Sequence, residues 1–88
     1  MEVILLPQAD ADLKYWKEKG NTRILKRIRT LLEDIQRHPF SGIGKPELLK
    51  GENGKWNRRI TDEHRLVYSV SNGRIYLYVF SMRFHYSK

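Results

Sequence analysis

The 88-residue sequence lacks cysteine altogether and has no apolar run approaching the roughly 20 residues that a membrane-spanning helix requires. The missing cysteines exclude disulfides, thiolate zinc ligands and cysteine nucleophiles. The start, from Met1 to Pro7, has no basic flank and is too short for a signal sequence. We therefore expect a cytoplasmic protein that does not bind a membrane and is stabilised by packing or by a partner.

Negative charge is also scarce. Ten Asp and Glu stand against 17 Lys and Arg, which gives a formal net charge of +7. On so small a chain this excess favours a polyanionic partner, most often nucleic acid, or an acidic protein, although solubility alone is the alternative. The length predicts one domain over residues 1–88, with a modest core and no large internal cofactor cavity.

The N-terminal half predicts a strand followed by a helical hairpin. Val3 to Leu6 is a short apolar run, and Pro7 is suited to the first position of a helix. Gly20 is placed to end that helix and Asn21 to cap the next, which stops before Pro39. The second helix has the clearest apolar stripe in the chain: Ile24, Ile28, Leu31, Leu32 and Ile35. We expect the basic outer face of this helix to be exposed to solvent, and the alternative is that it binds a partner.

Two strand-like runs follow, from Trp56 to Thr61 and from Arg65 to Ser71. Aligning Ile60 with Leu66 makes residues 62–64 a three-residue hairpin loop. Alternation then predicts a core face of Trp56, Arg58, Ile60, Leu66, Tyr68 and Val70. The opposite face carries Asn57, Arg59, Thr61, Arg65 and Val67. Two guanidiniums thus lie side by side on an open surface, which favours an anionic ligand.

A second hairpin is predicted at Asn72-Gly73, a strong signal for a two-residue turn. This turn pairs Val70 with Ile75, Tyr68 with Leu77 and Leu66 with Val79. Three aromatic rings then share the free face with the arginines: Tyr76, Tyr78 and Phe80. Basic groups interleaved with rings are typical of single-stranded nucleic-acid binding, while cross-strand stabilisation or cover by a partner subunit is the alternative.

Together these segments predict an α+β fold. An N-terminal strand and a two-helix hairpin precede an antiparallel meander of three to four strands, and both helices cover one face of the sheet.

The C-terminal tail contains the histidine best placed for proton transfer, His85, which is followed by Tyr86. The other two, His38 and His64, are expected to be surface residues. Strict alternation places Arg83 and His85 on the core side. Either a bulge near Ser81 reverses this or the tail leaves the sheet, and the sequence does not choose between them.

Five segments taken together resemble the YoeB (Txe/YoeB) toxins of bacterial toxin–antitoxin systems, within the RelE/ParE superfamily. The segments span nearly the whole chain: Tyr15-Trp16, His38-Pro39-Phe40, Gly44 to Lys50, Trp56 to Tyr68 and Arg83 to Tyr86. The resemblance implies a RelE-like fold and a ribosome-dependent endoribonuclease that cuts messenger RNA in the decoding A site of the 30S subunit. The family uses the 2′-hydroxyl of the RNA as nucleophile and needs neither metal nor cofactor.

The resemblance also assigns residues. Glu47 matches the general base, His85 the general acid and Arg65 the group that steadies the scissile phosphate. Supporting positions that bind phosphate or orient the substrate are matched by Lys50, Arg59 and Tyr86, and Arg83 matches a further basic position. The chain departs from the family pattern by extending to Ser87-Lys88 after the tyrosine.

The partners implied are mRNA on the ribosome, an acidic YefM-like antitoxin whose disordered tail folds on the toxin, and a second copy in a homodimer. Two rival functions are a ParE-like gyrase inhibitor without nuclease activity and a non-catalytic module that binds nucleic acid or antitoxin. Glu47 and the His85-Tyr86 pair argue against the gyrase inhibitor, because such a binder does not need them.

Overall fold

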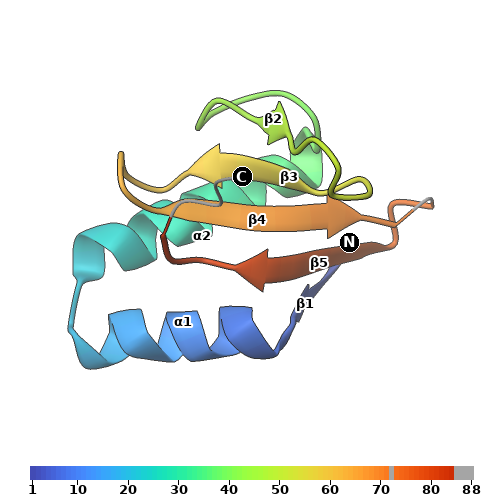
Figure 1. Ribbon diagram of the computed structural model, residues 1–88. Coiled ribbons are helices and arrows are strands. Elements are labelled where there is room, and N and C mark those ends of the chain that lie inside the picture. Colours follow the sequence, from blue (N-terminus) through green and yellow to red (C-terminus); the bar gives the residue numbers. More distant parts are fainter. Residues whose placement is uncertain (72, 85–88) are drawn as a thin grey trace.

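The computed structural model describes residues 1–71 and 73–84 and has two helices covering one face of a five-stranded sheet (Figure 1). The helices are α1 (Pro7–Glu18) and α2 (Thr22–Arg37). The strands are β1 (Glu2–Leu5), β2 (Glu47–Leu48), β3 (Trp56–Arg59), β4 (Arg65–Val70) and β5 (Tyr76–Ser81). The order across the sheet is β1-β5-β4-β3-β2, with β1 parallel to β5 and the other neighbours antiparallel. The predicted α+β class is confirmed, with a meander of four strands.

The helical hairpin begins and ends where the sequence predicts. Pro7 is the first residue of α1, and Gly20 follows that helix with a φ of 64°, a conformation that favours glycine. Asn21 caps α2, because its Oδ1 accepts a hydrogen bond from the amide of Ile24 at 3.1 Å.

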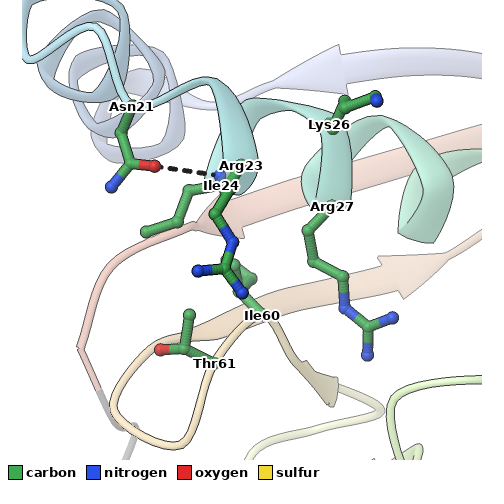
Figure 2. Close-up of a pocket in the computed structure, with 7 residues that line it drawn as sticks. All are labelled: Asn21, Arg23, Ile24, Lys26, Arg27, Ile60 and Thr61. Atoms are coloured by element: carbon green, nitrogen blue, oxygen red, sulfur yellow. Dashed lines mark hydrogen bonds between the residues drawn. The ribbon is translucent and has the colours of Figure 1, made fainter.

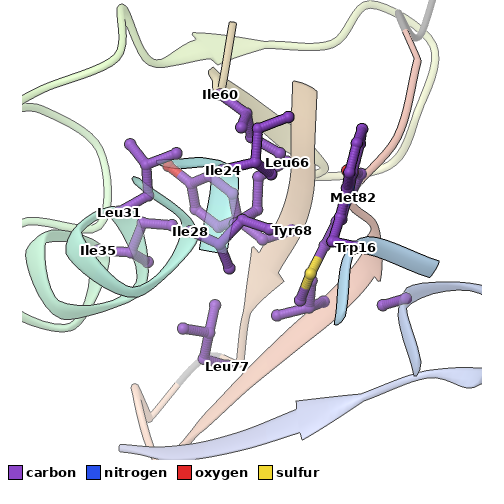
Figure 3. Packing of buried hydrophobic residues seen from close by; sticks show 12 residues of the cluster. Trp16, Ile24, Ile28, Leu31, Ile35, Ile60, Leu66, Tyr68, Leu77 and Met82 are labelled. Atoms are coloured by element: carbon purple, nitrogen blue, oxygen red, sulfur yellow. The ribbon is translucent and has the colours of Figure 1, made fainter. Parts of the chain in front are cut away.

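The core lies between the helices and the sheet (Figure 3). The apolar stripe of α2 is buried at Ile24, Ile28, Leu31 and Ile35. The sheet contributes Ile60, Leu66, Tyr68, Leu77 and Val79. Trp16 of α1 closes one end of this core against Met82, which follows β5 and has no solvent exposure. The predicted core face of β3 and β4 is therefore correct.

The predicted pairing of β3 with β4 is wrong by two residues. Leu66 lies opposite Arg58 instead of Ile60, and the amide of Ile60 donates to the carbonyl of His64 at 2.9 Å. The loop still has three residues, now 61–63, and it forms without glycine because Thr61 Oγ1 accepts hydrogen bonds from the amides of Glu63 and His64. Since the shift is an even number, every side chain keeps its predicted face.

The predicted two-residue turn between β4 and β5 is also wrong. Val70 pairs with Leu77, and the amide of Ser71 donates to the carbonyl of Tyr76 at 3.0 Å, which leaves four residues in the connection. The hydroxyl of Ser71 accepts hydrogen bonds from the amides of Ile75 and Tyr76, and Arg74 adopts a φ of 54°. These local interactions compete with the tight turn that the dipeptide alone suggests, although Asn72 lies outside the described residues.

A β-bulge interrupts β5. Tyr68 pairs with Val79 but Val67 pairs with Ser81, so Phe80 is the extra residue. The bulge reverses the alternation and points Met82 into the core. Of the two alternatives that the sequence left open, the structure therefore has the bulge near Ser81.

Candidate functional site

Three of the predicted site residues share the face of the sheet that the helices leave free. Arg59 on β3 lies directly opposite Arg65 on β4, closer than the predicted register had placed them. Glu47 on β2 lies opposite Asn57, one pair further along β3 on the same face. Because directly paired residues point to the same side, one carboxylate and two guanidiniums occupy adjacent strands.

Arg65 is held in place while part of its guanidinium remains available. Its Nη1 donates to Oδ1 of Asn57 at 3.0 Å, and Asn57 is itself buried. Its Nε is also buried and has no hydrogen-bond partner within residues 1–71 and 73–84. A guanidinium that a neighbour positions on the open face of the sheet is suited to binding an anion. Asn57 lies between Glu47 and Arg65: it pairs with Glu47 across β2 and β3, and its side chain accepts a hydrogen bond from Arg65. The sequence did not reveal this role of Asn57.

The guanidinium of Arg59 is held less firmly than that of Arg65. Its Nη1 lies 3.6 Å from Oδ1 of Asp62, a fully exposed carboxylate, and such surface pairs contribute only about 0–1 kcal/mol. Its backbone is more firmly fixed, because its amide donates to the carbonyl of Gly44 at 2.7 Å and its carbonyl accepts from Arg27. A ligand phosphate can therefore replace Asp62 at little cost.

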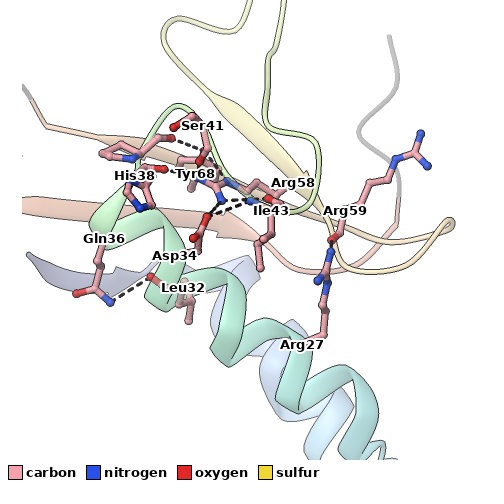
Figure 4. Close-up of polar contacts among 11 residues, drawn as sticks. Arg27, Leu32, Asp34, Gln36, His38, Ser41, Ile43, Arg58, Arg59 and Tyr68 are labelled. Carbon is pink, nitrogen blue, oxygen red and sulfur yellow. Dashed lines mark hydrogen bonds and ion pairs between the residues drawn. The ribbon is translucent and has the colours of Figure 1, made fainter.

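Glu47 and Lys50 are both exposed, on the short strand β2 and just after it. The loop that delivers them, residues 38–46, is held by the buried side chain of Arg58 (Figure 4). The acceptors of its guanidinium are Asp34 Oδ2, the hydroxyl of Tyr68 and the carbonyls of His38, Ser41 and Ile43. Every donor of this core arginine is thus matched, and the network fixes the path of the chain into β2.

This network also changes the ionisation of two groups. The hydrogen bond from Arg58 lowers the pKa of Asp34 below its ordinary value. Burial raises the pKa of the Tyr68 phenol, so this group stays neutral and donates to the carbonyl of Pro39 at 2.6 Å. Gly42 makes room for the pair, since a Cβ at this position would come within 2.1 Å of Asp34 Oδ2.

The chain after β5 is held against α1. The amide of Met82 donates to Asp12 Oδ2 at 2.8 Å, and Trp16 Nε1 donates to the carbonyl of Met82 at 3.0 Å. The guanidinium of Arg83 lies 3.6 Å from the ring centroid of Tyr15. Arg83 is thus placed by α1, and the predicted catalytic residues that follow it, His85 and Tyr86, lie outside the described residues.

The expectation that His64 is a plain surface residue is wrong. Its side chain is only 12% exposed, and its ring packs edge-on against Trp16 with 4.8 Å between centroids. Nδ1 accepts a hydrogen bond from the amide of Phe84 at 2.8 Å. No sequence pattern signals this contact, because its partners are 48 and 20 residues away.

The predicted interleaving of arginines and aromatic rings is only partly present. Tyr78 lies opposite Ser69, which is four residues along β4 from Arg65, and this spacing corresponds to about 13 Å. The rings of Tyr76 and Tyr78 are neighbours at 6.0 Å, while Phe80 lies under the ammonium group of Lys55. The two tyrosines therefore form a separate aromatic area, and the bulge and shifted register explain the difference.

A hollow of about 510 Å³ lies at the start of α2, beside the β3–β4 turn (Figure 2). It is lined by Asn21, Arg23, Ile24, Lys26, Arg27, Ile60 and Thr61. Ile24 and Ile60 also belong to the core, so the hollow lies on the helix side of the sheet. It is therefore distinct from the face that carries Glu47 and Arg65.

Neither helix in the described part of the chain is both long enough and apolar enough to cross a membrane. Among the same residues, no three His, Asp or Glu side chains gather in a group that could hold a metal ion.

Residues 6–86 match the family model described as the YoeB-like toxin of the bacterial type II toxin–antitoxin system. A relative, the toxin YoeB of Escherichia coli K12, is 45% identical over 87 residues, which cover 98% of this chain and 100% of the relative. A YoeB/ParE toxin from Agrobacterium tumefaciens has a similar structure, with a TM-score of 0.90 and 41% identity over 98% of this chain and 100% of that one.

Two structures from Staphylococcus aureus are also similar over 98% of both chains. One is a YoeB dimer, with a TM-score of 0.87 and 39% identity. The other is a YoeB–YefM complex, with a TM-score of 0.83 and 40% identity. The family match spans almost the whole chain and agrees with the RelE-like fold and with the shared motifs. The chain belongs to the YoeB-like toxins of bacterial type II toxin–antitoxin systems.

Proposed function

We propose that the protein is a ribosome-dependent endoribonuclease that cuts messenger RNA in the A site. The observation that carries this proposal is the placement of Glu47, Arg59 and Arg65 on one face of three adjacent strands. A base and paired cations at this spacing are suited to a phosphodiester, and membership of the toxin family supplies the context.

In the proposed reaction, Glu47 removes the proton of the ribose 2′-hydroxyl, whose oxygen attacks the adjacent phosphorus. The bond between phosphorus and the 5′-oxygen breaks, and His85 donates a proton to this leaving group. The products are a 2′,3′-cyclic phosphate and a free 5′-hydroxyl. Protons and electron pairs balance without a metal or cofactor.

The positively charged side chains stabilise the negative charge of the transition state. The negative charge on the phosphate oxygens increases in the pentavalent transition state, and Arg65 is oriented toward this task by Asn57. Supporting contacts to the phosphates and to the substrate are assigned to Lys50, Arg59, Arg83 and Tyr86.

The proposal extends to the partners and the compartment. The +7 charge suits an acidic antitoxin, and a YefM-like partner is proposed because the S. aureus relative is solved with YefM. A homodimer is proposed on the same basis, since that relative is also solved as a dimer. We place the activity in the cytoplasm, where ribosomes translate.

Mapping the 5′ ends of a message on translating ribosomes tests the reaction. Glu47→Gln, Arg65→Gln and His85→Gln should each lower the cleavage rate roughly 10²- to 10⁴-fold. Glu63→Gln in the exposed β3–β4 loop is the matched control and should cleave like the wild type. Unchanged cleavage by both Glu47→Gln and His85→Gln would overturn the mechanism, and inhibition of gyrase without new 5′ ends would favour the ParE-like alternative.

A further inference from the structure

The backbone after β5 is held by hydrogen bonds from two separate parts of the chain, helix α1 and the segment His64-Arg65. Met82 is bound by Asp12 and Trp16 of α1. Phe84 is bound on both sides: its amide donates to His64 Nδ1 at 2.8 Å, and its carbonyl accepts from the amide of Arg65 at 3.2 Å. The direction of the chain at Phe84 is therefore set by the turn between β3 and β4 and by the first residue of β4.

His64 is itself fixed at both its backbone and its ring. Its carbonyl accepts from the amides of Ile60 and Thr61, at 2.9 and 3.1 Å. Its ring lies between Trp16 and Phe84, with centroids 4.8 and 5.5 Å away. Because Nδ1 accepts a hydrogen bond, it carries no proton, and the ring proton of the neutral form is on Nε2.

The conformation of Phe84 needs such support. Its φ is 62°, in the left-handed region that non-glycine residues seldom adopt. Residues of this kind persist only where the surroundings hold them. If the contact to His64 is lost, Phe84 can relax to an ordinary conformation, which changes the direction in which the chain continues to residue 85.

We infer that His64 is a positioning residue for the C-terminal tail: by accepting the amide proton of Phe84, it sets the backbone from which His85 follows. This inference rests on the proposed function, in which His85 is the general acid. Because Arg65 directly follows His64, the contact of His64 with Phe84 also ties the position of the proposed acid to that of the proposed phosphate-binding arginine.

The test compares side chains that keep or lose the acceptor. In His64→Asn, Oδ1 lies near the place of Nδ1, whereas His64→Gln puts its amide near the place of Nε2, and His64→Leu has no acceptor. Glu63→Gln is the matched control, because Glu63 lies 3.7 Å from the other ring nitrogen. Thermal unfolding confirms that each variant folds before it is compared.

The first measurement is hydrogen exchange at the Phe84 amide in the full-length free protein. Exchange should accelerate at least 10-fold in His64→Leu and His64→Gln and stay near the wild-type rate in His64→Asn and Glu63→Gln. Equal Phe84 exchange in the wild type and His64→Leu would overturn the inference, whatever the activity.

The second measurement is the rate of message cleavage on programmed ribosomes. His64→Leu and His64→Gln should lower kcat about 10- to 100-fold, as small misplacements of a catalytic group do, with KM within about 2-fold. His64→Asn should recover most of kcat. A loss that Asn does not rescue, or one that appears mainly in KM, would overturn the inference. If the wild type itself cut no message, the proposed nuclease function would fail, and the exchange comparison would still decide whether His64 holds the tail.

Discussion

Arg58 carries a charge that has no solvent exposure, in a position that alternation assigns to the core. The charge is tolerated because Asp34 neutralises it and Tyr68 and three backbone carbonyls take its remaining donors. The same bonds fix the loop before β2, so this residue links stability to the placement of Glu47.

Arg58→Met should therefore lower the free energy of unfolding by about 3–5 kcal/mol, because it removes the guanidinium that neutralises Asp34 and donates to three backbone carbonyls. Urea unfolding followed by circular dichroism measures the change. Arg59→Met is the control and should cost less than about 1 kcal/mol, since the side chain of Arg59 is 40% exposed and forms its ion pair with an exposed carboxylate. Equal losses in both variants would contradict the assigned role of Arg58.

The lowered pKa of Asp34 makes stability depend on pH. A carboxyl with a folded pKa below its unfolded value of 3.8 contributes fully above that value. The contribution is lost as the pH falls through the folded pKa, when the carboxylate that Arg58 stabilises takes up a proton. Between pH 7 and pH 3, the Tm of the wild type should thus fall more than the Tm of Asp34→Asn. Parallel curves for the two proteins would show that Asp34 has no part in acid unfolding.

Among the secondary-structure elements, the limits of the helices follow from local sequence signals, whereas the register of the strand pairs does not. Pro7, Gly20 and Asn21 act within one turn of their own positions, so the helix limits could be predicted. Both hairpin registers were wrong by two residues because side chains of Thr61 and Ser71 accept backbone hydrogen bonds in the turns. Alternation survives an even shift, which is why the site residues still share a face.

The cap of α2 gives a prediction at this scale. Asn21→Ala should lower the free energy of unfolding by about 1 kcal/mol, because the amide of Ile24 loses its acceptor. Asn21→Asp keeps an acceptor at the same position and should remain close to the wild type in urea unfolding. If the two variants were equally destabilised, the stability of α2 would not depend on this hydrogen bond.

For the whole molecule, the net charge of +7 predicts that binding to ribosomes weakens as salt rises. The affinity of His85→Gln for ribosomes, measured by cosedimentation between 50 and 200 mM KCl, should fall linearly on logarithmic axes. Adding Arg59→Gln should reduce the slope by about one, because one phosphate contact is removed. Arg37→Gln, at the far end of α2, removes the same charge and should leave the slope unchanged. Equal slopes in both double variants would show that Arg59 does not contact phosphate.

The sequence by itself determined the class of fold, the helix limits, the free face that carries Arg59 and Arg65, and the family. These properties depend on periodicity, capping and motifs, which act over short distances along the chain. Only the tertiary structure decided the registers, the bulge at Phe80, the network around Arg58 and the contact of His64 with Phe84. Each of these joins residues that are distant in sequence, and which donor meets which acceptor is settled only when the helices and strands pack together.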